Sequence, residues 1–456
     1  MKKDSAQPGS RQLYFAALIG MGFLWTGTAY IVQAYRLLLF IDGDTVNLIS
    51  CGLYYVCQAM GMALVGLLFL KHEDFAGGRA FPLWTSAIAL VCTGISLLSS
   101  SLPVMIASGG LLNIMIGILS ACYLTRLATN VPQQRRGLVF GGAYAFGTIG
   151  TWLVSMPMKG SFLWHNSSFL AVATLGVLSL LLLRQLPPLA KRKGALRSSC
   201  ASSVRKLIFL AAAVLFFLSM DNTLGFSFPL KSASDSVYIE FTRIFYGIGL
   251  VLAGLINDKN RRWGAICCLA ALAFPFAGLA LGSSMAGETA MWMLAYLFLG
   301  FWSAYRILVF ADLSAKTGLP VLAVTGLMAG RLGEAAGTLG ASLCTGTPLI
   351  VLAGIVFALV IASFFPLYQK LYAPPVNPED AEQQRLEQYV THFCLSAREQ
   401  EIFSQIIKGL SNGEIADALY ITESTVKFHV GNIFRKTGHS HRRELISDYK
   451  LGDRRR

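Results

Sequence analysis

The chain has 456 residues, of which 54% are hydrophobic and only 14% charged, and its formal net charge is +14. This composition excludes an ordinary soluble globular protein, in which about a quarter of the residues are charged. The basic excess lies within residues 1–370, among long apolar runs, so the net charge alone does not indicate nucleic-acid binding.

Residues 1–370 contain apolar runs of about twenty residues or more, long enough to cross the roughly 30 Å hydrocarbon layer of a bilayer as helices. The first run is too long for a signal peptide and is counted as a span. We predict an all-α polytopic bundle of twelve spans, at 13–40, 46–70, 81–100, 102–124, 137–157, 162–184, 207–230, 237–257, 263–283, 289–311, 320–344 and 348–369.

Basic residues gather in alternate connections between these spans. The longest such connection, 185–206, contains Lys191, Arg192 and Lys193, whereas the intervening connections hold few basic residues. Since basic connections stay on the cytoplasmic side of a membrane, this alternation predicts that both termini are cytoplasmic.

The connection 185–206 divides the spans into two halves, 1–184 and 207–370, with six spans each. The segment 143–153 of the fifth span resembles the segment 333–343 of the eleventh span. A pattern that returns at the equivalent position favours duplication of a six-helix unit, although two glycine-rich spans can also be alike by chance.

This arrangement resembles the major facilitator superfamily of transporters, in which two six-helix bundles enclose a central cavity. The segment from Gly254 to Asp258, followed by Arg261 and Arg262, resembles the cytoplasmic loop motif of that family and implies a gating loop. The first half departs from the motif, because Leu70 stands where the aspartate is expected. The loss of one copy weakens the interpretation as a transporter.

Charged residues inside the spans are candidates for a ligand site, because a charge in a membrane is costly unless it is paired or hydrated. The resemblance places several of them near the central cavity, and we predict ligand contacts for Arg36, Asp221, Arg243 and Arg306. The alternative is that Asp221, Arg331 and Glu334 form a structural ion-pair network, because Arg331 and Glu334 are three residues apart on one helix and can pair with each other. The arginines favour an anionic or catechol-like ligand.

The sequence shows no motif of an enzyme, a metal site or a cofactor site. The nine cysteines lie mostly inside spans and lack the paired spacing of a zinc site, so they are interpreted as small apolar residues. The sequence also lacks a P-loop and a recognisable catalytic triad. We therefore predict neither an enzyme nor a cofactor.

The composition changes after the last span. Pro374, Pro375 and Pro378 are expected to end the apolar helix, and a polar stretch follows, so 371–394 is predicted to be a linker.

Signals for three successive helix starts follow in residues 395–456. Ser396 with Glu399, and Ser411 with Glu414, have capping-box spacing, and Thr422 can cap a third helix. The predicted inward face of the third helix consists of Val426, Val430 and Ile433. Its outer face carries Ser424, Lys427, Phe428, Gly431 and Arg435. A short helix, a tight turn and a helix with a polar outer face are typical of the helix-turn-helix, whose outer face enters the major groove of DNA.

This segment is similar to the four-helix LuxR-type DNA-binding domain, through positions that include Leu395–Glu399, Gly409–Asn412, Glu414–Ala416, Thr425–Lys427 and His429. The resemblance implies that Lys427 and Phe428 face base edges and that 440–450 mediates dimerisation on double-stranded DNA. The predicted DNA contacts are Ser424, Thr425, Lys427, Phe428, Asn432, Arg435 and Lys436. Gly431 stands where relatives often carry a lysine that contacts a base. This domain should therefore contact fewer bases directly.

These features predict a one-component transcription regulator in the bilayer of a bacterial cytoplasmic membrane, in which a small molecule bound by the bundle controls the DNA-binding domain. The alternative is a secondary transporter with a fused regulatory domain. A third hypothesis is a scaffold that sequesters a partner regulator through 440–450.

Overall fold

The computed structural model describes residues 8–156, 166–186, 189, 202–232, 239–281, 285–372 and 378–451. The chain divides into two compact units. The membrane unit comprises Met1–Lys191 and Phe209–Tyr372, and the C-terminal unit comprises Arg192–Ile208 and Ala373–Arg456.

All secondary structure in the described residues is helical, which confirms the predicted fold class. The first half of the membrane unit contains α1 (Pro8–Leu37), α2 (Gly43–Asn47), the π-helical η1 (Leu48–Leu53), α3 (Tyr54–Lys71), α4 (Glu73–Gly77), α5 (Ala80–Leu98), α6 (Leu102–Asn130), α7 (Gln133–Ser155) and α8 (Asn166–Leu183). The second half contains α9 (Ser202–Ser232), α10 (Ile239–Lys259), α11 (Arg261–Leu281), α12 (Met285–Thr317), the 3-10 helix η4 (Pro320–Val324), α13 (Thr325–Leu343) and α14 (Thr347–Tyr372). Each predicted span overlaps one of the twelve long helices in these two lists.

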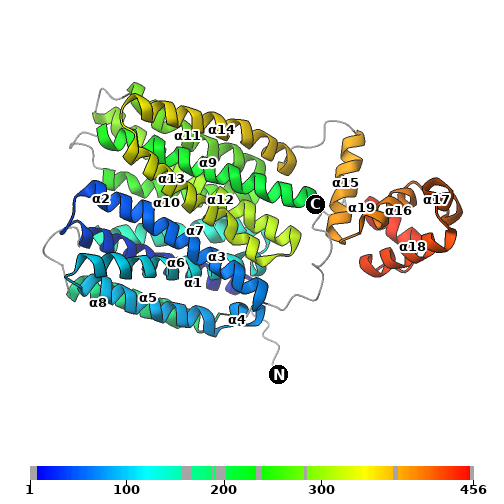
Figure 1. Cartoon of the computed structure of the whole chain (residues 1–456), viewed down its shortest axis with the longest axis horizontal. Helices are drawn as coiled ribbons and strands as arrows, with labels where there is room; N and C mark the ends of the chain where they lie inside the picture. Colours follow the sequence, from blue (N-terminus) through cyan, green and yellow to red (C-terminus); the bar gives the residue numbers. More distant parts are fainter. Residues whose placement is uncertain are drawn as a thin grey trace. The chain divides into compact units, whose positions relative to one another are not determined.

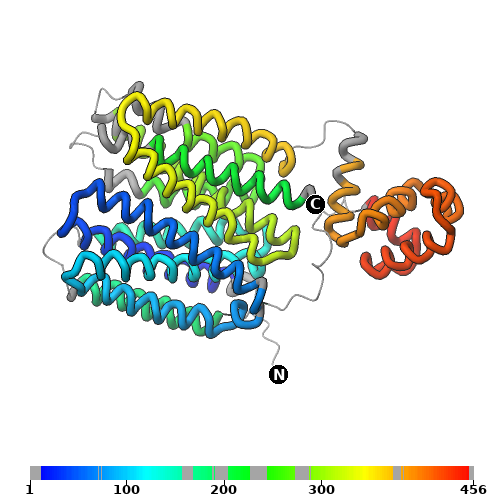
Figure 2. The backbone as a smooth tube through the Cα atoms, in the orientation of Figure 1, coloured from blue at the N-terminus to red at the C-terminus, as the bar shows by residue number. Residues whose placement is uncertain are grey.

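The long helices of the membrane unit run side by side, and their path can be followed from blue to yellow (Figures 1 and 2). Eight helices in the described part of the chain are long and apolar enough to cross a membrane. Two of the remaining long helices, α10 and α13, carry charged residues that lower their hydropathy. Large apolar side chains such as Trp84, which is 70% exposed, cover the outside of the unit.

The two halves meet where α7 packs against α10 and where α3 packs against α13. At the first contact the backbones touch, because a Cβ atom added to Gly141 would lie 2.3 Å from the carbonyl oxygen of Leu250. The two similar segments, 143–153 and 333–343, lie in α7 and α13. Each therefore belongs to a helix that packs against the opposite half.

The C-terminal unit contains α15 (Pro378–His392), α16 (Ala397–Ile407), α17 (Asn412–Leu419), α18 (Glu423–Thr437) and α19 (Arg442–Leu451). Its hydrophobic core is built from all five helices. The range 371–394, predicted as a linker, thus contains a helix that belongs to this unit. A helix starts here because Pro378 occupies the first position of α15. Proline favours that position, since no backbone N–H is needed there.

Candidate functional site

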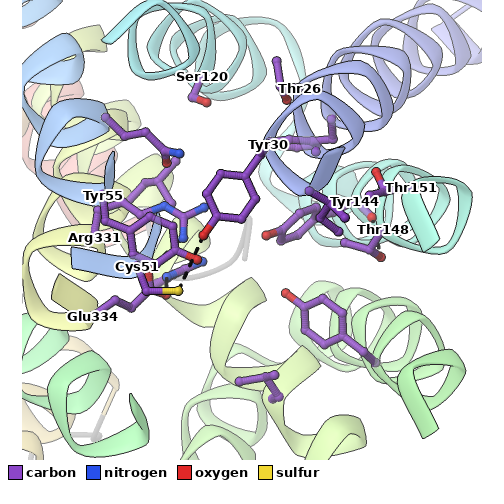
Figure 3. A pocket seen from close by; sticks show the side chains of 18 of the residues that line it. Thr26, Tyr30, Cys51, Tyr55, Ser120, Tyr144, Thr148, Thr151, Arg331 and Glu334 are labelled. Carbon is purple, nitrogen blue, oxygen red and sulfur yellow. Dashed lines mark hydrogen bonds and ion pairs between the residues drawn. The ribbon is translucent and has the colours of Figure 1, made fainter. Parts of the chain in front are cut away.

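A cavity of about 490 Å³ lies inside the membrane unit and is lined by residues of both halves. This volume is within the range of small-molecule sites, roughly 300–1,000 Å³. The wall is rich in aromatic side chains, and Tyr30, Tyr55 and Tyr144 project into the space (Figure 3). The other large aromatic residues that line it include Phe23, Phe140, Trp152, Tyr246, Tyr296 and Trp302.

Three charged residues of the second half form a buried group at the cavity. Glu334 of α13 accepts a hydrogen bond from Arg306 of α12 on Oε1, at 2.6 Å, and one from Arg331 on Oε2, at 2.7 Å. The Arg306 side chain is only 2% exposed, and that of Glu334 is 10% exposed. The predicted pair between Arg331 and Glu334 is confirmed, but among the described residues its further partner is Arg306, and Asp221 makes no hydrogen bond to it. One carboxylate between two guanidinium groups leaves one positive charge.

Aromatic rings hold both guanidinium groups in place. The Cζ atom of Arg306 lies 4.1 Å from the centroid of the Trp302 ring, and that of Arg331 lies 4.2 Å from the centroid of the Tyr55 ring. A cation over an aromatic face is stabilised by the quadrupole of the ring. Tyr55 belongs to the first half and Arg331 to the second, so this contact joins the halves beside the cavity.

Of the four predicted ligand residues, only Arg306 is among the described residues that line the cavity. Arg36 donates to the carbonyl oxygen of Ser99 at 3.0 Å and thereby ties α1 to the end of α5. Asp221 is 1% exposed, and neither of its carboxylate oxygens has a hydrogen-bond partner among the described residues. Arg243 lies in α10, but its side chain is outside the described residues.

Sequence reasoning found only part of the buried group. The i, i+3 spacing of Arg331 and Glu334 was the signal for it, but that spacing could not show that Arg306 of another helix joins them.

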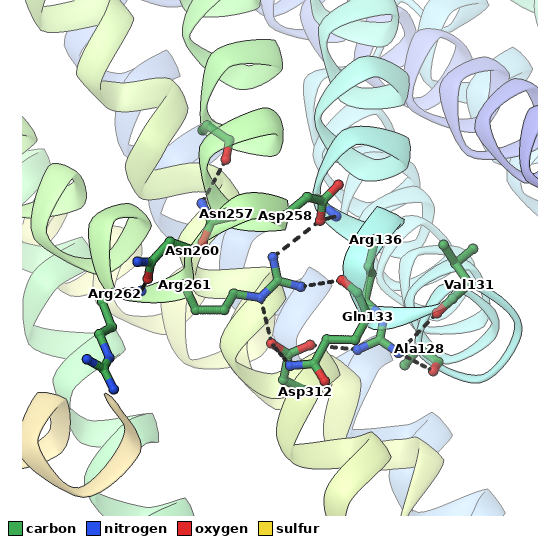
Figure 4. Close-up of polar contacts among 12 residues, drawn as sticks. Ala128, Val131, Gln133, Arg136, Asn257, Asp258, Asn260, Arg261, Arg262 and Asp312 are labelled. Atoms are coloured by element: carbon green, nitrogen blue, oxygen red, sulfur yellow. Dashed lines mark hydrogen bonds and ion pairs between the residues drawn. The ribbon is translucent and has the colours of Figure 1, made fainter. Parts of the chain in front are cut away.

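Residues of the predicted gating loop connect α10 and α11 to α7 (Figure 4). The Asp258 carboxylate accepts hydrogen bonds from the backbone N–H groups of Gly137 and Leu138, each at 2.7 Å. A Cβ atom on Gly254 would lie 2.5 Å from the carbonyl oxygen of Gly137, so the backbones are in contact here. This anchors the end of α10 to the first turns of α7.

Asp312 of α12, which the sequence did not single out, is the centre of the same network. It accepts from Arg136 at 2.6 Å and from Arg261 at 2.8 Å. Arg261 also donates to the carbonyl oxygen of Gln133 at 2.9 Å. For Arg262 the contact shown is local, from its backbone N–H to Asn260. Two arginines from different halves therefore share one carboxylate.

In the C-terminal unit, the side chains predicted to start the helices do so. Ser396 and Glu399 form a capping box at the start of α16, and Ser411 and Glu414 form one at the start of α17. Thr422 accepts a hydrogen bond from the backbone N–H of Thr425 and begins α18. The backbone N–H of Ser411 shifts the pKa of Glu414 below its ordinary value, because it stabilises the carboxylate.

The two faces of α18 are as predicted. Val426 and Ile433 are fully buried and Val430 is 9% exposed, so they fix the helix on the core. The outward residues are exposed, and they are Ser424, Lys427, Phe428, Gly431 and Arg435. Phe428 is 67% exposed, which is unusual for a large aromatic side chain outside an interface. Lys427 pairs with Glu423 at 2.9 Å in an exposed position, where water competes and the lysine can be released to another partner.

The other predicted DNA contacts differ in accessibility. Thr425 and Asn432 are partly buried, and Asn432 accepts from Arg435 at 3.0 Å. Lys436 points inward and forms an ion pair with Glu399, which is 6% exposed, and it also donates to the carbonyl oxygen of Cys394. In this structure Lys436 ties α18 to the start of α16, and its contact with DNA stays a prediction.

No metal site is apparent: within the described ranges, no group of three or more His, Cys, Asp or Glu residues could hold an ion.

Residues 394–447 match the family described as bacterial regulatory proteins, luxR family. An uncharacterized transcriptional regulatory protein of Bacillus subtilis, YhcZ, is 42% identical over 60 residues, which are 13% of this chain and 25% of that protein. The CsgBAC operon transcriptional regulatory protein of Escherichia coli is 43% identical over 53 residues, which are 12% of this chain and 24% of that protein. The chain thus spans about a quarter of the length of these curated relatives.

Solved structures show the fold of the membrane unit. The human organic anion transporter MFSD10 (TETRAN) aligns with 78% of this chain and 99% of its own, at a TM-score of 0.57 and 15% identity. The major facilitator superfamily transporter FucP, in its outward conformation, aligns with 78% of this chain and 97% of its own, at a TM-score of 0.58 and 14% identity. LuxR-type domains bind DNA, and neither group is an enzyme family. The chain therefore joins a LuxR-type helix-turn-helix domain to a multi-pass membrane unit that has the major facilitator superfamily fold.

Proposed function

We propose that this protein is a membrane-integrated one-component transcription regulator. A small molecule bound in the cavity would control how the exposed face of α18 binds double-stranded DNA. The protein would lie in the bacterial cytoplasmic membrane with both termini in the cytoplasm, where the DNA is, and would bind DNA as a homodimer through 440–450.

The observation that carries this proposal is the position of α15 in the C-terminal unit. This helix follows the last membrane helix in the chain, yet it is part of the core that supports the helix-turn-helix. The Tyr389 ring stacks on Phe403, with centroids 4.9 Å apart and planes 4° apart, and meets the Tyr449 ring edge-on at 5.4 Å. The Tyr389 hydroxyl donates to Asp448 at 3.0 Å. In this proposal, α15 is the element through which the membrane unit acts on α16 and α19.

The cavity supplies a physical basis for the signal. Arg306, Arg331 and Glu334 lie on α12 and α13, whereas Tyr55 beside them belongs to the first half. A ligand that binds more tightly to one arrangement of the halves would shift the population toward that arrangement. The contacts of Asp258 and Asp312 between the halves would form in one arrangement and break in the other.

The alternative is a secondary transporter with a fused regulatory domain, and one observation favours it. The contact network around Asp258 and Asp312 is intact on the side of α7 and α10, as a gate that opens and closes would require. Uptake into vesicles containing the purified protein separates the two proposals. Accumulation of a solute against its gradient would support transport.

The DNA-binding part is tested by sequencing DNA crosslinked to the full-length protein in its native membrane. We expect discrete enriched sites that are lost with Lys427→Ala and retained with Lys408→Ala, a matched change at an exposed lysine at the end of α16. Equal enrichment in the wild type and Lys427→Ala, at equal protein levels, would contradict DNA reading by α18.

A further inference from the structure

The polar atoms left without partners in the cavity wall are all of one kind. Among the described residues that line the cavity, five buried nitrogen atoms have no hydrogen-bond partner, and each is a donor. They are Nε1 of Trp152, Nδ2 of Asn222, Nε1 of Trp302, Nε of Arg306 and Nε of Arg331. No described lining residue has a buried acceptor in the same condition.

Buried polar groups in folded proteins nearly always have a hydrogen-bond partner. These five donors have almost no accessible surface in this arrangement, so acceptors of a ligand would reach them only after the side chains move. Three of the five donors are close together, because Arg306 contacts Trp302 and both arginines bind Glu334.

The charge of the wall indicates the charge of the ligand. Both carboxylate oxygens of Glu334 are already engaged, one by each arginine. One positive charge in the buried group is thus left over, and Asp221 is not among the described residues that line the cavity. Burying an uncompensated charge is unfavourable, so a ligand with one negative charge is favoured.

The aromatic side chains of the wall favour a ligand with an aromatic ring. Tyr30 and Tyr55 stack with centroids 5.9 Å apart and planes 20° apart, and Tyr144 meets Tyr246 edge-on at 6.0 Å. Tyr30, Tyr55 and Tyr144 of the first half lie around the space near Arg331 (Figure 3), and Tyr246 of the second half also lines the cavity. Aromatic rings prefer such stacked or edge-on partners.

We infer that the cavity binds an aromatic monocarboxylate. The carboxylate lies beside the guanidinium groups of Arg306 and Arg331, and the ring packs among the tyrosines. The inference names the ligand class for the proposed function and rests on it for its biological meaning, but binding itself does not require DNA.

The test uses the full-length protein in lipid nanodiscs and follows fluorescence of tryptophan, since Trp152 and Trp302 line the cavity. The probes are 2-naphthoate, its neutral alcohol 2-naphthalenemethanol, its cationic amine 2-naphthylmethylammonium, and the non-aromatic anion cyclohexanecarboxylate. We expect the Kd of 2-naphthoate to be about tenfold lower than that of each of the other three, or lower still. Failure of 2-naphthoate to bind, or binding of the alcohol or the amine with equal affinity, would overturn the inference.

Variants then locate the site. Arg331→Gln makes the buried group neutral and should weaken 2-naphthoate binding about tenfold or more, with little effect on the alcohol. Arg135→Gln, at an exposed arginine that bonds Gln12 outside the cavity, is the control and should bind like the wild type. If Arg331→Gln does not fold, Glu334→Gln serves instead, because the added positive charge should tighten 2-naphthoate and weaken the amine. Unchanged selectivity in the folded variants would overturn the site.

The same probes distinguish this inference from the proposed function. If 2-naphthoate binds with the expected selectivity but DNA occupancy is unaltered by any cavity ligand or variant, the ligand class stands and the sensor proposal fails.

Discussion

The cavity wall and the helix starts of the C-terminal unit differ in whether their polar groups have hydrogen-bond partners within the chain. In the C-terminal unit, Ser396 with Glu399 and Ser411 with Glu414 satisfy the first turns of their helices with their own side chains. In the cavity wall, buried donors such as that of Trp302 have no acceptor among the described residues. The first region completes its hydrogen bonding by folding, whereas the second leaves buried donors without an acceptor among the described residues.

If the C-terminal unit is complete in itself, its stability should depend strongly on the shared core of α15, α16 and α19. Phe403 is fully buried and stacks on Tyr389, so Phe403→Ala should cost about 3–5 kcal/mol and abolish DNA binding. Hydrogen exchange of the full-length protein would show loss of protection throughout 378–451. Loss confined to α16 would show that α15 is not part of this core.

The pair of Glu399 and Lys436 gives the next largest effect. Glu399→Gln leaves Lys436 without its charged partner and should destabilise the C-terminal unit by about 2 kcal/mol, the range for a hydrogen bond to a charged group. The matched control is Arg398→Gln, which breaks an exposed pair with Glu401 and should cost less than about 1 kcal/mol. Chemical unfolding followed through the C-terminal unit measures both changes, and equal losses in the two variants would contradict a structural role for the Glu399 pair.

The same pair predicts how stability depends on pH. Burial raises the pKa of Glu399, but the hydrogen bonds from Lys436 and from the Ser396 backbone outweigh it and hold the pKa below its ordinary value. Because the folded-state pKa is lowered, the pair contributes fully above the unfolded value of about 4.3 and is lost as the pH falls through the folded value. The free energy of unfolding should therefore fall more steeply with acid in the wild type than in Glu399→Gln, which has no carboxyl group to titrate at this position. Parallel curves for the two proteins below about pH 5 would contradict this role.

DNA binding should respond at the exposed face of α18 without any change in stability. Lys427→Ala should weaken binding to an enriched DNA site by about 1–3 kcal/mol, the range for one good base contact. Its pair with Glu423 is exposed, so unfolding should be unaffected. Titration of the full-length protein with that DNA site measures the first effect and thermal unfolding the second. A large loss of stability would show that Lys427 is structural.

The smallest effect on stability among the buried positions is expected in the cavity. Trp302→Phe removes a buried N–H group that has no acceptor among the described residues, so no hydrogen bond is lost. The unliganded protein should lose only about 1 kcal/mol, from weaker packing against Arg306. The same substitution should weaken 2-naphthoate binding. A stability loss as large as that of Phe403→Ala would show that the wall is packed for stability and would remove the contrast between the two regions.

The sequence predicts the helix starts of the C-terminal unit better than the contacts of the cavity wall, because the signals for helix starts are local. The starts of α16, α17 and α18 depend on side chains three residues apart, and such local signals are visible in a sequence. The twelve long helices follow in the same way from apolar runs. The signal for the start of α15 was also local, because it is Pro378, but this proline was interpreted as the end of the preceding helix.

The cavity depends on contacts between distant segments, which no local pattern reports. Glu334 could be paired with Arg331 from spacing, but its bond to Arg306 comes from the packing of α12 against α13. Arg36 was predicted at the cavity from its charge and its span, whereas it bonds the end of α5. Asp312 was overlooked because its two arginine partners lie in other helices.

The central claim is that the cavity and the DNA-binding face are coupled, and DNA occupancy in a cavity variant tests it most directly. Crosslinked DNA would be sequenced from cells that express equal levels of the wild type, Arg331→Gln or Trp84→Phe, the last at an exposed position on α5. We predict that occupancy of the Lys427-dependent sites changes in Arg331→Gln and not in Trp84→Phe. Equal occupancy in all three proteins would contradict the coupling.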